Sequence, residues 1–277
     1  MIPAAFDYHR ATSVEEAIGL LREHGDEAKL LAGGHSLLPL MKLRLAAPGL
    51  LIDIGRLQEL SYIREDGDRI AIGALTRHRD VEISDVLRRH VPLLAHATSK
   101  VADPQVRHRG TIGGSIAHGD PASDVPAVCL ALRARFTTVG PAGERQIEAD
   151  DFFQGFLETA IAPDEVLTEI SVAKAGGSGW SFQKFNRRAQ DWAIVGVAAV
   201  ASINGSDPGV ALVNMGSTPL RARAVETALV GGATAVEAAT HASDGLDPPD
   251  DLNASPEYRR HLAFVLVRRA LEEAGVA

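Results

Sequence analysis

The 277-residue sequence predicts an α+β fold in which a larger N-terminal part precedes a smaller part of antiparallel strands and helices. Three observations support this prediction. Short apolar runs of strand length alternate with helical apolar spacing through the first part. Residues 175–179, Ala-Gly-Gly-Ser-Gly, then interrupt the pattern and mark a candidate boundary. Beyond them, strand-like runs come together and helices follow, which favours an antiparallel sheet packed against helices.

The N-terminal part begins with a helix signal. Ser13 can cap a helix, Glu16 stands three residues later, and Gly25 ends the apolar stripe. Three short apolar runs have the composition of buried strands: 29–32, 50–54 and 69–73. A turn at 65–68 precedes the last of these runs.

Helical spacing returns at 81–99, where Pro92 is tolerated in the first turn of a new helix. A glycine-rich segment, 110–119, separates it from further expected elements: a helix at 125–132 and strands near 135–139 and 166–172. In the C-terminal part we expect three strands, at 180–185, 194–203 and 210–215. Two helices are expected after them, at 221–230 and 257–273. The Asp/Pro-rich segment 243–256 predicts an exposed loop.

Composition excludes several classes of function. Lys and Arg total 28 against 36 Asp and Glu, a net charge of −8, and there is no basic tract of the kind that binds nucleic acid or an anionic membrane. No apolar stretch reaches the length of a membrane span, and no signal peptide is visible. The single cysteine, Cys129, can form neither an internal disulfide nor an iron–sulfur site, and low cysteine use fits a cytoplasmic location.

Two segments have the composition of anion-binding loops. The first, Ala32-Gly33-Gly34-His35-Ser36, follows an expected strand. The second is Thr111-Ile112-Gly113-Gly114-Ser115. Glycines let backbone N–H groups converge on a phosphate, and the hydroxyl residues add donors.

Each loop alone is a weak signal, since a Gly-Gly pair is common in ordinary turns. Neither matches a Walker loop or the G-x-G-x-x-G fingerprint. Together, however, the two loops could hold one diphosphate from both sides. The two loop histidines, His35 and His118, have no accompanying set of ligands at metal spacing, so a zinc site is not expected.

A few further residues carry alternative interpretations. Asp124 could cap the next helix or accept hydrogen bonds from a ribose, and both roles are compatible. Lys184 and Trp192 stand on either side of a basic turn; they could belong to an amphipathic strand pair or border a planar redox ring. A cation there would favour an anionic reduced cofactor.

Three motifs together resemble the FAD-binding medium subunits of molybdenum hydroxylases: Ala32–Ser36, Thr111–Ser115 and the segment Asp120-Pro121-Ala122-Ser123-Asp124. The resemblance extends over essentially the whole chain, in the same order and spacing. It implies an FAD-binding domain of the vanillyl-alcohol-oxidase (PCMH) type at 1–175, with subdomains of about 1–55 and 56–175. A smaller domain of the carbon monoxide dehydrogenase flavoprotein type would occupy 176–277.

The resemblance also implies roles for individual residues. The two glycine loops would bind the FAD diphosphate, and Asp124 would hold the ribitol. Leu167, Lys184 and Trp192 would lie near the isoalloxazine ring, while Lys29 and Ala102 match flanking positions. FAD would be bound non-covalently, and no catalytic residue or metal ligand is expected in this chain.

The same resemblance implies a function within an assembly. An iron–sulfur small subunit with two 2Fe–2S clusters would pass electrons to FAD, a large subunit would carry molybdopterin, and an external acceptor would take the electrons. The assembly would be a dimer of heterotrimers. Two alternatives stay open at this point: a self-contained FAD oxidase or reductase of the same fold, and a scaffold protein that has lost its flavin.

Overall fold

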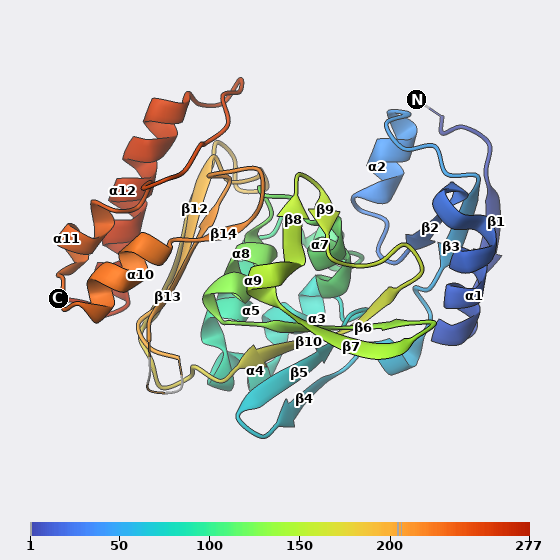
Figure 1. Cartoon of the computed structure of the whole chain (residues 1–277), viewed down its shortest axis with the longest axis horizontal. Coiled ribbons are helices and arrows are strands. Elements are labelled where there is room, and N and C mark those ends of the chain that lie inside the picture. The colour runs from blue at the N-terminus through green and yellow to red at the C-terminus, as the bar shows by residue number, and fades with distance from the viewer. Residues whose placement is uncertain (1, 204, 206) are drawn as a thin grey trace.

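The structure is a computed structural model that describes residues 2–203, 205 and 207–277, and it confirms the α+β fold. Three sheets follow one another along the chain, and a two-stranded hairpin accompanies them. In Figure 1 the N-terminal sheet and α1 lie at the right, the central sheet lies below the middle, and the C-terminal sheet with its helices lies at the left.

The N-terminal sheet has the order β1-β3-β2, with both outer strands parallel to β3: β1 (Asp7–Arg10), β2 (Ala28–Leu31) and β3 (Leu50–Asp53). Helix α1 (Val14–His24) covers it, and the expected signals at both ends are confirmed. The Ser13 side chain accepts a hydrogen bond from the Glu16 amide, and Gly25 follows the helix with φ of 53°. A short helix, α2 (Leu37–Lys42), follows the first glycine loop.

The central sheet is antiparallel throughout, with the order β4-β5-β10-β6-β7. Its strands are β4 (Ile63–Asp66), β5 (Arg69–Gly73), β6 (Arg135–Gly140), β7 (Gly143–Glu148) and β10 (Val166–Ala173). The sequence analysis found the three inner strands and missed the two edge strands. Both edges are largely exposed and polar, so they lack the apolar run that identifies a buried strand.

Short helices cover the central sheet between the strands: α3 (His78–Ile83), α4 (Asp85–His90), α5 (Pro92–Ser99), α6 (Pro104–Arg107), α7 (Ile112–His118), α8 (Asp124–Ala131) and α9 (Ala149–Phe152). A 3₁₀ turn, Gln58–Leu60, and the hairpin of β8 (Phe153–Gly155) and β9 (Glu158–Thr159) complete this part, and a second 3₁₀ turn, Gly25–Glu27, joins α1 to β2 in the N-terminal part. Pro92 occupies the first turn of α5, as expected.

The C-terminal sheet is antiparallel, with the order β11-β12-β13-β14, as the sequence predicted for this part. Its elements are β11 (Trp180–Phe185), β12 (Val195–Val200), β13 (Gly209–Val213), β14 (Leu220–Arg221), α10 (Arg223–Val230), α11 (Ala235–Ala239) and α12 (Pro256–Glu273). The long helix α12 packs against β11 and β12. Residues 243–255 have no helix or strand, as expected, and the last residue of the expected loop, Pro256, is instead the first residue of α12.

Helix α8 connects the central and C-terminal parts. All eight of its residues are buried. It packs on α5 and also on β12 and β13, so one apolar core continues from the central sheet into the C-terminal sheet. The first residue of this helix, Asp124, therefore lies at the junction of the two parts. Within the described residues, no helix is both long and apolar enough to cross a membrane.

Candidate functional site

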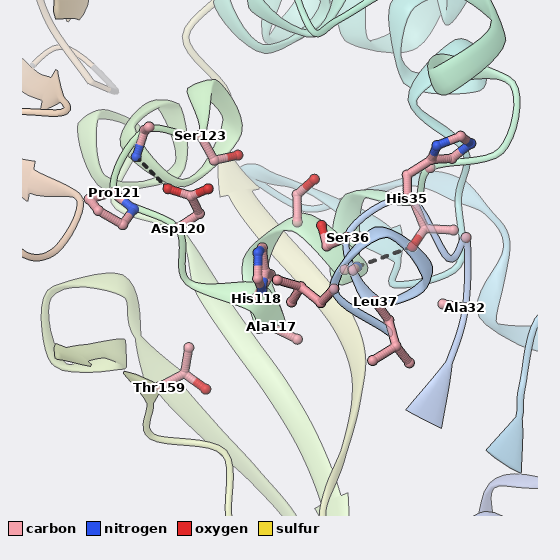
Figure 2. Close-up of a pocket in the computed structure, with 18 of the residues that line it drawn as sticks. Ala32, His35, Ser36, Leu37, Ala117, His118, Asp120, Pro121, Ser123 and Thr159 are labelled. Carbon is pink, nitrogen blue, oxygen red and sulfur yellow. Dashed lines mark hydrogen bonds between the residues drawn. The ribbon is translucent and has the colours of Figure 1, made fainter. Parts of the chain in front are cut away.

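One large cavity, of about 1310 Å³, lies where the three parts of the chain meet. Figure 2 shows residues of the first glycine loop, among them His35 and Ser36, on one side of it. Asp120 and Ser123 lie on the opposite side, with His118 between the two groups. The cavity thus extends from the N-terminal sheet to the start of α8.

Every site residue proposed from the sequence lines this cavity: Lys29, Ala32, Gly33, Gly34, His35, Ser36, Ala102, Thr111, Gly113, Gly114, Ser115, Asp124, Leu167, Lys184 and Trp192. These residues come from segments far apart in the sequence. Their convergence on one cavity is a property of the fold that neither spacing nor composition could establish.

The first glycine loop lies against the backbone that leads into the second loop. A Cβ atom at Gly33 would lie 2.4 Å from the Arg109 carbonyl oxygen and 2.8 Å from Gly110 Cα, so only glycine permits this contact. Gly34 has φ of 77°, in the left-handed region that favours glycine. Among the described residues, the amide groups of 33–36 have no protein acceptor. The backbone N–H groups of the first loop are therefore free to donate to a ligand.

The second loop differs from the sequence expectation, because it forms the first turn of α7 and its amides are already bonded. Ile112 N donates to Thr76 O (3.0 Å) and Gly113 N to Ala74 O (2.9 Å). Gly114 N donates to Thr111 Oγ1 at 3.1 Å, and Ser115 N to Thr111 O at 3.2 Å. Hydrogen-bonding capacity toward the cavity therefore falls on the side chains of this loop.

Glycine at 113 has a steric cause as well. A Cβ atom there would lie 2.5 Å from Ala74 Cβ and 2.6 Å from Ala74 O, so the loop lies directly on the end of β5. Gly114 is different, because it is exposed in the cavity wall and a Cβ would meet only Thr111 Oγ1, at 2.7 Å. Gly113 is therefore required for the packing of the loop on β5, and Gly114 keeps the cavity wall free of a side chain.

A buried ion pair closes the cavity at the junction with the C-terminal sheet. Lys184 Nζ lies 2.6 Å from Asp124 Oδ2 and also donates to Lys100 O at 3.0 Å. Burial raises the pKa of Asp124 to about 6, although Lys184 opposes this shift. The other carboxyl oxygen, Oδ1, is buried without a hydrogen-bond partner. It is an acceptor suited to a ligand hydroxyl group.

Ala102 and Trp192 have unusual features at the cavity. Ala102 has φ of 43°, a left-handed conformation that costs a residue with a Cβ of order 1–3 kcal/mol. Arg107 donates to the carbonyl oxygen of the preceding residue, Val101, at 2.9 Å and holds this turn. Trp192 is 72% exposed, although it is a large aromatic residue. An exposed indole beside a cavity can stack on a flat ligand.

Sequence reasoning missed two residues at this cavity. His78 is buried beneath the second loop, and its ring nitrogen Nε2 lies 3.0 Å from Ser115 Oγ. Asn214 has φ of 61°; its amide donates to Pro121 O (2.8 Å) and its side chain to Ala193 O (2.9 Å). No periodicity or motif distinguishes either residue, because both act through contacts across the fold.

Comparisons with known families define the class of protein. Residues 4–174 match the family described as the FAD binding domain in molybdopterin dehydrogenase. Residues 180–274 match the CO dehydrogenase flavoprotein C-terminal domain. These two matches lie on either side of the glycine-rich segment 175–179.

Individual relatives are similar in sequence over nearly the whole chain. The carbon monoxide dehydrogenase medium chain of Hydrogenophaga pseudoflava is 45% identical, over 99% of this chain and 98% of that protein. Subunit alpha of the 6-hydroxypseudooxynicotine dehydrogenase complex of Paenarthrobacter nicotinovorans is 39% identical over 99% of this chain and 96% of that protein.

A solved structure agrees as well. The structure of carbon monoxide dehydrogenase from Hydrogenophaga pseudoflava contains a chain that superposes with a TM-score of 0.95, at 46% identity over 100% of both chains. The chain therefore belongs to the family of FAD-binding medium subunits of molybdenum hydroxylases.

Proposed function

We propose that this chain binds FAD non-covalently in the cavity and relays electrons from an iron–sulfur partner subunit to an external acceptor. The observation that carries the proposal is the convergence of both glycine loops, Asp124, Lys184 and Trp192 on one cavity of about 1310 Å³. When bound, FAD supplies a redox centre that accepts electrons and releases them again.

The diphosphate end of the cofactor fits the glycine loops. The unpaired amides of 33–36 are donors that a phosphate requires. Across the cavity, Ser115 adds a hydroxyl group, and Gly114 leaves room for close approach. We propose that Ala32–Ser36 and Thr111–Ser115 hold the diphosphate between them.

The flavin end fits the junction between the two parts of the chain. The unpartnered Oδ1 of Asp124 suits a ribityl hydroxyl donor, because binding would satisfy a buried acceptor. We propose that Leu167, Lys184 and Trp192 border the ring, with Lys29 and Ala102 at flanking positions. Lys184 would bring a positive charge whose effect Asp124 moderates through the ion pair.

Electron relay requires partners. A single cysteine, Cys129, cannot hold a 2Fe–2S cluster, which needs about four ligands. Cys129 is also fully buried. We propose that a small subunit carries the clusters, that a large subunit carries molybdopterin, and that the complex is a dimer of heterotrimers. One relative belongs to a carbon monoxide dehydrogenase and the other to a 6-hydroxypseudooxynicotine dehydrogenase, so we propose that the large subunit selects the substrate.

The organisation within the chain follows the same proposal. We propose an FAD-binding domain at 1–175, with subdomains of about 1–55 and 56–175, and a C-terminal domain at 176–277. The family matches to residues 4–174 and 180–274 support the boundary between the two domains, while one apolar core continues across it. We also propose a cytoplasmic location, which low cysteine use favours.

Stopped-flow mixing tests the relay. The iron–sulfur partner, reduced chemically and freed of excess reductant, is mixed without oxygen with the FAD-loaded chain, and flavin absorbance is followed. We expect the flavin to bleach while the cluster absorption recovers. The matched control is the same chain stripped of FAD, which should leave the partner reduced. A loaded chain whose flavin stays oxidised would contradict the relay.

A further inference from the structure

A buried histidine lies beneath the second glycine loop. His78 begins α3 and is 2% exposed, and its Nε2 lies 3.0 Å from Ser115 Oγ. Its amide donates to Gly110 O at 3.0 Å. A Cβ atom on Gly110 would lie 2.9 Å from His78 Cδ2, so the ring packs directly on the loop backbone. The orientation of the ring is therefore fixed by packing.

The ring of His78 is neutral at ordinary pH. Burial, with Arg107 and His35 nearby, lowers the pKa of His78 to about 4. A neutral imidazole has one N–H donor and one lone-pair acceptor, and its surroundings decide which nitrogen carries the hydrogen. The two ring nitrogens of His78 have different surroundings, so the two neutral tautomers differ in energy.

The second ring nitrogen, Nδ1, is buried and has no hydrogen-bond partner. If Nδ1 carried the hydrogen, a buried N–H donor would be unsatisfied, and such donors are rarer in proteins than under-satisfied acceptors. If Nε2 carries the hydrogen, it donates to Ser115 Oγ, and the unpaired atom is only a lone pair. The contacts therefore favour hydrogen on Nε2.

This choice determines what Ser115 can do. A hydroxyl group has one hydrogen to donate. If Ser115 gave that hydrogen to His78, its oxygen could not donate to a phosphate. With Nε2–H as the donor, the hydrogen of Ser115 is free to point into the cavity. This hydroxyl hydrogen is important for binding because the backbone amides of 112–115 already have acceptors within the protein.

We propose that His78 is a positioning residue that donates from Nε2 to Ser115 Oγ and thereby directs the Ser115 hydroxyl hydrogen toward the diphosphate of the cofactor. The proposal rests on the proposed binding of FAD. In this proposal His78 does not bind the cofactor directly. It acts through the hydroxyl group of Ser115.

The tautomer can be measured directly by NMR of protein labelled with nitrogen isotope at histidine. The expected spectrum of the wild-type protein at neutral pH shows His78 with hydrogen on Nε2 and a bare Nδ1. The substitution His78→Phe assigns the signal. Hydrogen on Nδ1 in the FAD-bound protein would overturn the proposal, whatever the affinity for FAD.

A double-mutant cycle measures the coupling through affinity for FAD. His78→Phe keeps a ring of similar size but removes the donor, and we expect about tenfold weaker binding. Ser115→Ala should weaken binding by a similar factor, and the double variant by no more than Ser115→Ala alone. His78→Gln, whose side-chain amide can donate, should bind close to wild-type affinity. His96→Phe, a half-buried ring on α5, is the matched control and should leave affinity unchanged.

The outcomes distinguish this proposal from the binding of FAD itself. A wild-type chain that takes up no FAD, alone or with its partners, would contradict both. Normal FAD binding with no effect of His78→Phe would overturn only the role of His78. Losses that multiply in the double variant would also overturn it, because His78 would then act independently of Ser115. If His78→Phe fails to fold, the affinity of His78→Gln and the NMR measurement of the tautomer still test the role of His78.

Discussion

Lys184 Nζ lies 2.6 Å from Asp124 Oδ2, and this ion pair links strand β11 of the C-terminal sheet to the first turn of α8. Both side chains are buried, at 7% and 5% exposure. A buried pair of this kind contributes little net stability over an apolar pair, but the loss of one partner leaves an uncompensated charge. Removal of either partner should therefore be costly at the junction of the two parts of the chain.

Lys184→Met tests this relationship through stability. Removing the cation leaves the Asp124 carboxyl group buried without its partner, and we expect the free energy of unfolding at neutral pH to fall by about 3–5 kcal/mol. Denaturant titration measures the change. The control is Lys174→Met, which breaks a solvent-exposed pair with Glu65 (2.7 Å) and should leave the free energy of unfolding nearly unchanged. Equal losses in both variants would contradict the importance of the buried pair.

The pH dependence of stability provides a second test at Asp124. The pKa of Asp124 in the folded chain is about 6, raised from its ordinary value of 3.8, chiefly by burial. The folded chain binds this proton more tightly than the unfolded chain, so protonation of Asp124 stabilises the fold. This stabilisation is fully present below pH 3.8 and is lost as the pH rises through 6. Relative to Asp124→Asn, the wild-type protein should lose stability across this window, with a slope of up to about 1.4 kcal/mol per pH unit.

Unfolding free energies measured at several pH values for both proteins check this prediction. Asp85→Asn is the matched control, since the Asp85 side chain is 93% exposed, and its profile should run parallel to that of the wild type. If the difference between wild type and Asp124→Asn stays constant across the window, the raised pKa is wrong.

Gly114→Val should weaken FAD binding at least tenfold, about 1.4 kcal/mol. Its side chain would enter the cavity wall and displace the Thr111 hydroxyl group, which lies 2.7 Å from the Cβ position. Equilibrium titration with FAD measures the loss. Gly19→Val on α1 is the control, because a Cβ there would have no atom within 4 Å outside the local helix backbone and the adjacent residues. Retained affinity in Gly114→Val would exclude the second loop from the diphosphate site.

Trp192→Ala should reduce FAD affinity by about 2- to 10-fold, the value of an aromatic stacking contact of about 0.5–1.5 kcal/mol. The melting temperature should hardly change, because Trp192 is 72% exposed. The chain has two tryptophans, and Trp180 instead packs against His96 with ring centroids 5.3 Å apart. FAD should therefore quench tryptophan emission in the wild type and much less in the variant.

Leu252→Ala is the matched control, since Leu252 is 99% exposed in the loop before α12. It should keep both the affinity and the quenching. Quenching that persists undiminished in Trp192→Ala would show that the flavin ring lies elsewhere in the cavity.

The fold could be predicted from the sequence where local patterns determine it. β5 and β11 have the predicted bounds, and α1 has the expected cap and end. Polar edge strands such as β4 were missed, because exposed strands carry no apolar run. Helix α7 was not expected, since glycine disfavours helices; Thr111 caps it, and its packing on β5 requires Gly113.

The residues proposed for the candidate site came from three motifs and from positions that the family resemblance matches, and all of them line one cavity. What the sequence could not provide is how they are connected. The ion pair of Asp124 and Lys184 joins positions 60 residues apart, and His78 reaches Ser115 across 37 residues. Such contacts depend on tertiary packing and leave no trace in local composition.

The measurement that tests the central claim most directly is the visible absorption spectrum of the purified chain, alone and co-expressed with its partner subunits, after incubation with FAD and removal of the excess. The account predicts flavin bands, and acid denaturation should release stoichiometric FAD into the supernatant, which shows non-covalent binding. A protein that stays colourless in both preparations would contradict the account, and the glycine loops would then be structural turns alone.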